Sequence, residues 1–135
     1  MSYDNPERMH YIIAANDFGG GADTTQIVAG PAGKRGRVAY VHVYDVTETF
    51  VGTTTGGQVL VGLSGDTDAY FESDHTEMQG SAPAVAAALM LTNTLDTSSK
   101  DIIIPADTAV HITCVATVGG TVTGIASVDV VIDWF

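Results

Sequence analysis

The stretch that decides the fold is Thr108–Phe135, which reads TAVHITCVATVGG, two further residues, and then TGIASVDVVIDWF. Apolar and polar side chains alternate within Val110–Val118 and again within Ala126–Trp134. A period of two is typical of a β-strand that lies with one face on a core. Glycines at 119 and 120 separate the two halves as a turn. We therefore expect two strands here, the second of them an inner strand of a sheet.

Turn residues interrupt the rest of the chain about every eight to twelve residues, a spacing typical of an antiparallel sandwich or barrel. Between these turns, the expected strands are Met9–Ala15, Thr25–Ala29, Arg37–Phe50, Gln58–Leu63, Ala69–Glu72, Val85–Thr92 and Asp101–Ile104. Apolar residues fall on both sides of Arg37–Phe50, which predicts a strand that is central or covered on both faces.

One segment leaves two interpretations open. Residues 82–91 read APAVAAALML, and their alanines favour a helix by propensity. The alternative, to which we give a slight preference, is a strand packed closely against a neighbour. The expected fold class is thus all-β, an antiparallel jelly-roll-like β-sandwich of about eight strands. An immunoglobulin-type sandwich fits less well because Cys114 is the single cysteine and has no partner for a disulfide.

Length and charge narrow the classes of function. A chain of 135 residues is long enough for one domain, and 45% hydrophobic residues argue against disorder. The net charge of −11 disfavours nucleic-acid binding. We find neither a membrane-spanning apolar run nor a signal peptide, so we expect no membrane association and a protein made in a cytoplasm, or used in something assembled there.

Basic residues are few and unevenly placed. Three of the five, Lys34, Arg35 and Arg37, lie within four positions, and the others are Arg8 and Lys100. One interpretation is a solvated loop that pairs with the chain's own acids. The other is a docking point for an acidic partner.

We find no arrangement of residues that carries out chemistry. Gly62–Gly65 lacks the spacing of a serine-hydrolase elbow, and Gly30–Arg35 lacks that of a phosphate-binding loop. The four histidines are scattered, so no metal site is expected. The acidic loops 66–68 and 72–77 offer carboxylates of the kind that calcium prefers, but we favour solvated turns. We expect no enzyme activity and no cofactor.

Short sequence blocks in a consistent order carry a family resemblance. These blocks are Asp17–Gly21, Gly30–Val38, Thr47–Phe50, Val61-Gly62, Gly65–Tyr70, Ile104–Thr108 and Val131–Phe135. Together they resemble capsid cement, or decoration, proteins, which tailed bacteriophages encode beside the major capsid protein. The resemblance implies a jelly-roll-like homotrimer without catalytic residues. It would bind the major capsid protein on the virion exterior, after assembly in the host bacterial cytoplasm, and clamp neighbouring capsomers against internal DNA pressure.

Local charge and glycine content suggest where such a protein contacts its partner. We divide the chain into an N-terminal segment 1–18, a possible capsid-binding arm, and a β-sandwich domain 19–135. The candidate partner-binding residues are Arg8, Phe18, Lys34, Arg35, Arg37, His75 and Glu77. The alternative functions are a phage fibre, spike or other surface β domain that binds carbohydrate, and an enzyme of the cupin type, which the scattered histidines oppose.

Overall fold

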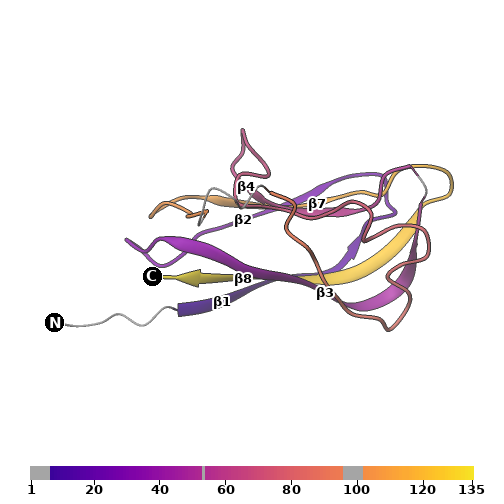
Figure 1. Cartoon of the computed structure of the whole chain (residues 1–135), viewed down its shortest axis with the longest axis horizontal. Helices are drawn as coiled ribbons and strands as arrows, with labels where there is room; N and C mark the ends of the chain where they lie inside the picture. The colour runs from indigo at the N-terminus through magenta and orange to yellow at the C-terminus, as the bar shows by residue number, and fades with distance from the viewer. Residues whose placement is uncertain (1–6, 53, 96–101) are drawn as a thin grey trace.

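The computed structural model describes residues 7–52, 54–95 and 102–135, which form strands and loops and no helix. The strands are β1 (Glu7–Asp17), β2 (Thr24–Val28), β3 (Gly36–Val51), β4 (Gln58–Gly62), β5 (Phe71–Glu72), β6 (Leu89–Met90), β7 (Val110–Val115) and β8 (Thr123–Trp134). They build two four-stranded antiparallel sheets, which Figure 1 shows as two layers. The predicted all-β sandwich is confirmed.

The order of the strands follows from pairing the first strand with the last. Sheet A has the order β1-β8-β3-β6, and sheet B has the order β2-β7-β4-β5. The antiparallel pairs β1–β8, β2–β7, β3–β6 and β4–β5 resemble one long hairpin folded over on itself. This arrangement of eight strands is that of a jelly roll. The turn at Gly119-Gly120 therefore carries the chain from sheet B to sheet A and closes no hairpin.

The core lies between the two sheets, and β8 contributes the largest continuous part of it. Ala126, Val128, Val130, Ile132 and Trp134, the alternating residues of this strand, are all buried. They belong to one apolar cluster with the inward residues of β7 and β4 in sheet B. β8 lies between β1 and β3, so the prediction of an inner strand is confirmed.

Two irregularities along β3 add apolar residues to this core. Strict alternation would place Val38 and Val46 on the same side as Tyr40. The register with β8 instead shifts between Val38 and Tyr40, and again between Tyr44 and Glu48. A bulge of this kind changes which face the following residues occupy. Val46 is therefore buried and Val38 packs against the core, while the outer side of β3 remains partly exposed.

Two expected strands are shorter than the sequence suggests, and a third does not form in its described part. The strand expected at Ala69–Glu72 is only Phe71–Glu72, β5. In residues 82–91, only Leu89 and Met90 form a strand, β6, and the remainder forms loops and turns. Ala86 has a positive φ of 66°, which neither a helix nor a regular strand accommodates. Ile104 makes only an isolated bridge with Gly36, and Asp101 lies outside the described residues.

The described part of the segment 1–18 is integral to the sandwich. Glu7–Asp17 forms β1 and pairs with β8 along its length, with a bulge between Ile13 and Asn16. Phe18 is fully buried, and its ring lies 5.2 Å from that of Phe50. Phe18 is thus a core residue, and its side chain is not accessible to a partner at the surface. No helix within the described residues is long and apolar enough to cross a membrane.

Candidate partner-binding face

Strand register brings the basic residues together at one end of sheet A. Arg8 of β1 and Arg37 of β3 lie on either side of Asp133 of β8, on the outer face of the sheet. Arg35 exchanges two backbone hydrogen bonds with Phe135, of 2.9 and 2.8 Å. Lys34 forms an ion pair of 3.2 Å with Glu7. Arg8, Lys34, Arg35 and Arg37 together are called the basic end below.

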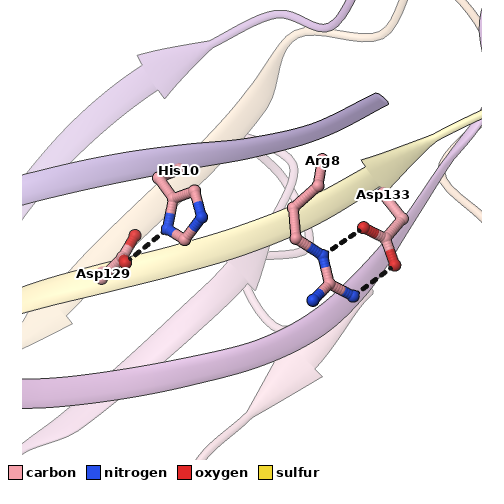
Figure 2. A network of polar contacts seen from close by, with 4 residues as sticks. All are labelled: Arg8, His10, Asp129 and Asp133. Atoms are coloured by element: carbon pink, nitrogen blue, oxygen red, sulfur yellow. Dashed lines mark hydrogen bonds and ion pairs between the residues drawn. The ribbon is translucent and has the colours of Figure 1, made fainter. Parts of the chain in front are cut away.

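Arg8 is held in place by its partners on the sheet. Its Nε and Nη2 donate to the two oxygens of Asp133 at 2.8 and 3.0 Å, as Figure 2 shows. The guanidinium also lies 5.6 Å from the centre of the Tyr40 ring. The hydrogen bond from Arg8 lowers the pKa of Asp133, and Asp133 in turn raises the pKa of Arg8. Both groups are therefore charged at neutral pH and fixed in a bidentate pair.

Phe135 provides an aromatic surface for the other two arginines. The guanidinium carbons of Arg35 and Arg37 lie 5.1 and 5.6 Å from the centre of its ring. Both arginines are exposed, whereas Phe135 is half-buried. A guanidinium that stacks on a ring presents N–H groups along its edge, in a geometry that suits carboxylates. The basic end can thus bind acidic side chains.

A second polar group lies further along the same face. His10 Nδ1 is 2.6 Å from Asp129 Oδ2 (Figure 2). The other oxygen, Oδ1, is buried and has no hydrogen-bond partner among the described residues. His42 lies opposite Asp129 on β3, and its ring stacks on Tyr44 with the centroids 5.4 Å apart. Tyr40, His42 and Tyr44 thus form an aromatic row on the outer side of β3.

The acidic loops do not assemble a metal site. Within the described residues, no group of three or more His, Cys, Asp or Glu side chains is arranged to hold a metal ion. A hydrogen bond with Asp68 raises the pKa of Asp66, because a nearby carboxylate makes the ionised form of Asp66 less favourable. The backbone N–H and hydroxyl of Thr76 lower the pKa of Asp74.

The structure separates the candidate residues other than the buried Phe18 into two groups. Arg8 joins Lys34 and Arg35 of the loop before β3 and Arg37 of β3, although Arg8 and Lys34 are 26 positions apart in the sequence. His75 and Glu77 lie instead in the segment between β5 and β6, where Glu77 accepts hydrogen bonds of 2.9 and 3.2 Å from Thr92. Lys100 lies outside the described residues.

Sequence reasoning missed the aromatic and acidic side chains that position the basic end. Alternation in β8 places Asp133 on the outward face, and that signal is present in the sequence. Tyr40 points the same way as Arg37 only because the register of β3 shifts between Val38 and Tyr40, which the sequence does not reveal. The register across three strands, which brings Asp133 between Arg8 and Arg37, is set by tertiary structure.

A comparison with known proteins found no matching family model, no matching curated protein and no matching solved structure. The surface of the molecule itself is therefore the basis for inferring its function.

Proposed function

We propose that this protein is a structural virion protein that binds the outer surface of a tailed-phage head, as capsid cement proteins do. In this proposal, homotrimers bind the major capsid protein and clamp neighbouring capsomers, and the protein catalyses no reaction. The observation that carries the proposal is the basic end, which gathers four bases on a chain of net charge −11. The positive charges of the basic end would attract an acidic surface, whereas the acidic remainder of the molecule would repel polyanions such as DNA.

The composition of the basic end favours a protein partner. Arg35 and Arg37 lie over an aromatic ring, and Arg8 is fixed by Asp133 and Tyr40. Arginine and aromatic side chains are enriched among the residues that contribute most to protein–protein binding. Arginines held in place before binding also lose less conformational freedom when the partner arrives. The partner expected here is an acidic patch on the capsid surface.

Clamping follows from mass action. A protein that binds the assembled lattice but not its separated subunits stabilises the lattice by its free energy of binding. A trimer that spans neighbouring capsomers raises the effective concentration of each further contact. Many such copies together oppose the separation of capsomers, without any change in covalent structure.

The test is cosedimentation with the empty and mature heads of the phage that encodes the chain. The variant Lys34→Ala/Arg35→Ala/Arg37→Ala is expected to bind at least about tenfold more weakly, or about 1.4 kcal/mol. The matched control Arg35→Lys/Arg37→Lys keeps the charge and removes the planar guanidinium groups. It should bind more tightly than the alanine variant but more weakly than the wild type.

Raising the salt concentration should weaken wild-type binding more than binding of the alanine variant, because exposed charges are screened. An alanine variant that coats heads with full affinity at high salt would remove the basic end from the interface. Absence of wild-type binding to any head would contradict the proposal as a whole.

A second candidate function is supported by the aromatic row. Tyr40, His42 and Tyr44 lie along one side of β3, and flat rings are the groups on which sugars stack. In this case the protein is a surface β domain that binds carbohydrate. Binding on a glycan array that is lost in Tyr40→Ala/Tyr44→Ala, together with no affinity for heads, would favour this function over the first.

A further inference from the structure

The outer face of sheet B has one charged side chain within its strands, Glu72 of β5, which lies opposite Leu60 at the edge away from β2. The other three strands present a surface without charge. The core residues Ile112 and Cys114 of β7 pair with Val61 and Val59 of β4, so the residues between them point outward. The outward residues that form the neutral face are Thr25, Ile27, Gln58, Leu60, His111 and Val115. β2, β4 and β7 contain no Asp, Glu, Lys or Arg at all.

The neutral face continues into an unprotected sheet edge at β2. This strand reads TTQIV, pairs with β7 in continuous register, and is exposed over four of its five residues. Ile27 is 62% exposed, the highest value among the exposed large hydrophobic residues of the described chain. An edge strand presents unpaired backbone N–H and C=O groups, and natural proteins normally protect it with charges, proline or a bulge.

The other three edges of the sandwich carry such protection. β1 has charged residues at both ends and a bulge between Ile13 and Asn16. β5 and β6 have only two residues each, too few to pair extensively with another chain. β2 alone among the edge strands of the described residues combines length with an absence of charge.

The net charge of −11 decides which partner fits this surface. Two copies of such a chain repel each other wherever their acids approach within about 8 Å at physiological salt. A surface without acids lets copies approach closely without this repulsion. A charged partner would gain no electrostatic complementarity from the neutral face. A second copy of this chain suits it because apolar and threonine side chains meet without repulsion.

We infer that neighbouring copies of this chain associate through the neutral face and the β2 edge. Burial of Ile27 supplies the apolar contact, and the backbone groups of β2 supply hydrogen bonds. This inference rests on the multimeric form in the proposed function and names the surface that builds it. The basic end on sheet A and the neutral face on sheet B then serve two different partners.

The experiment measures the mass of the full chain in solution by sedimentation equilibrium. The wild type is expected at a multiple of its 14.0 kDa chain mass, and Ile27→Lys at the mass of one chain. The matched control is Ile12→Lys, on the edge strand β1 of sheet A, where Ile12 is 51% exposed. Both variants reduce the net negative charge equally, so general repulsion cannot explain a loss of assembly in one of them.

Urea unfolding followed by Trp134 fluorescence verifies that each variant is folded. If Ile27→Lys does not fold, Thr25→Lys on the same strand replaces it and is expected to give single chains. Higher salt should strengthen wild-type self-association, because it screens repulsion between copies, although it weakens binding through the basic end. A wild type that is monomeric at every concentration, or an assembly that Ile27→Lys and Thr25→Lys leave intact, would overturn the inference.

The two proposals fail in different ways. Loss of assembly in Ile27→Lys supports the neutral face even when no phage head binds the protein. A monomeric wild type that still binds heads contradicts the neutral face and leaves the basic end as the capsid contact.

Discussion

At the scale of single residues, Trp134 is held between two close-packed glycines. Its ring is buried, and its Nε1 donates a 2.9 Å hydrogen bond to the hydroxyl of Tyr11. A Cβ atom on Gly30 would lie 2.5 Å from the ring, and one on Gly36 would lie 2.6 Å from it. Glycine is required at both positions because the backbone approaches the ring closely. The guanidinium groups of Arg35 and Arg37 lie over the ring of the next residue, Phe135. The packing of Trp134 therefore also positions the basic end.

The variant Gly36→Ala is expected to lower the free energy of unfolding by about 1–3 kcal/mol, since the added methyl group must displace a buried ring. Gly65→Ala is the matched control, because a Cβ there meets nothing within 4 Å. Its stability should be unchanged or slightly raised, as alanine restricts the unfolded chain. Urea unfolding followed by tryptophan fluorescence compares the two. Equal effects at both positions would contradict the described packing of Trp134.

Cys114 is expected to be unreactive in the folded protein. Burial raises the pKa of its thiol to about 12, so almost no thiolate is present at pH 8. Labelling with a thiol-specific reagent should be negligible without denaturant and should reach one thiol per chain in guanidinium chloride. Rapid labelling of the native protein at pH 8 would show that β7 opens readily or that the thiol is exposed.

At the scale of the strand, the second irregularity of β3 depends on Asp45. This residue has a positive φ of 49° and lies where the register with β8 shifts. Residues other than glycine adopt this conformation at a cost, and β-branched residues do so least readily. The shift turns Val46 into the core, so the conformation of Asp45 has a direct effect on packing.

Asp45→Gly is expected to raise the free energy of unfolding by up to about 1 kcal/mol, and Asp45→Val to lower it by about 1–2 kcal/mol. Thr47→Gly, two residues further along the same strand, is the control and should be destabilising, because Thr47 has no positive φ and glycine there only adds freedom to the unfolded chain. Thermal or urea unfolding gives the three values. The same sign for both glycine variants would mean that Asp45 carries no strain.

The elements that were predictable from the sequence are those with long, regular alternation. An apolar period of two predicts β8, β7 and most of β3. These strands in turn predict the all-β class. The shifts near Ala39 and Asp45 were not predictable, since a bulge shows itself only against the partner strand. For the same reason, the basic cluster Lys34–Arg37 was visible in the sequence, but its contact with Phe135 and its proximity to Arg8 were not.

At the scale of the whole molecule, many acidic side chains stabilise the fold by accepting hydrogen bonds from the backbone rather than by forming ion pairs. Several of them accept a hydrogen bond from a backbone N–H: Asp17, Asp23, Glu48, Asp74, Glu77 and Asp107. A carboxylate that binds a backbone donor needs no basic partner to be stabilised. A chain with sixteen acids and five bases can therefore use its acids structurally.

The ion pair between Arg8 and Asp133 makes the free energy of unfolding depend on pH, in a direction that can be tested. The hydrogen bond from Arg8 lowers the pKa of Asp133 in the folded state. A lowered pKa stabilises the fold fully above the unfolded value of about 4, and this contribution is lost as the pH falls through the folded value. The wild type should thus exceed Asp133→Asn in free energy of unfolding at pH 7, and the difference should shrink below about pH 4.

Asp66 gives the matched control of opposite sign. Its pKa is raised by Asp68, so its ionised form is less favourable in the folded than in the unfolded chain. Asp66→Asn should be at least as stable as the wild type at pH 7, with the difference vanishing in acid. Urea unfolding at several pH values measures both variants. A difference for Asp133→Asn that grows on acidification would refute the described pair with Arg8.

The central place of β8 in sheet A has a consequence for how the protein is made. This strand is translated after both of its neighbours, β1 and β3, and it is what joins them. Until it leaves the ribosome, the apolar sides of those two strands have no common support. Pairing between such distant segments is slow to form, because a long loop must close first. A nascent chain that stalls before Thr123 is thus expected to depend on chaperones, and sheet A is completed only after synthesis of β8.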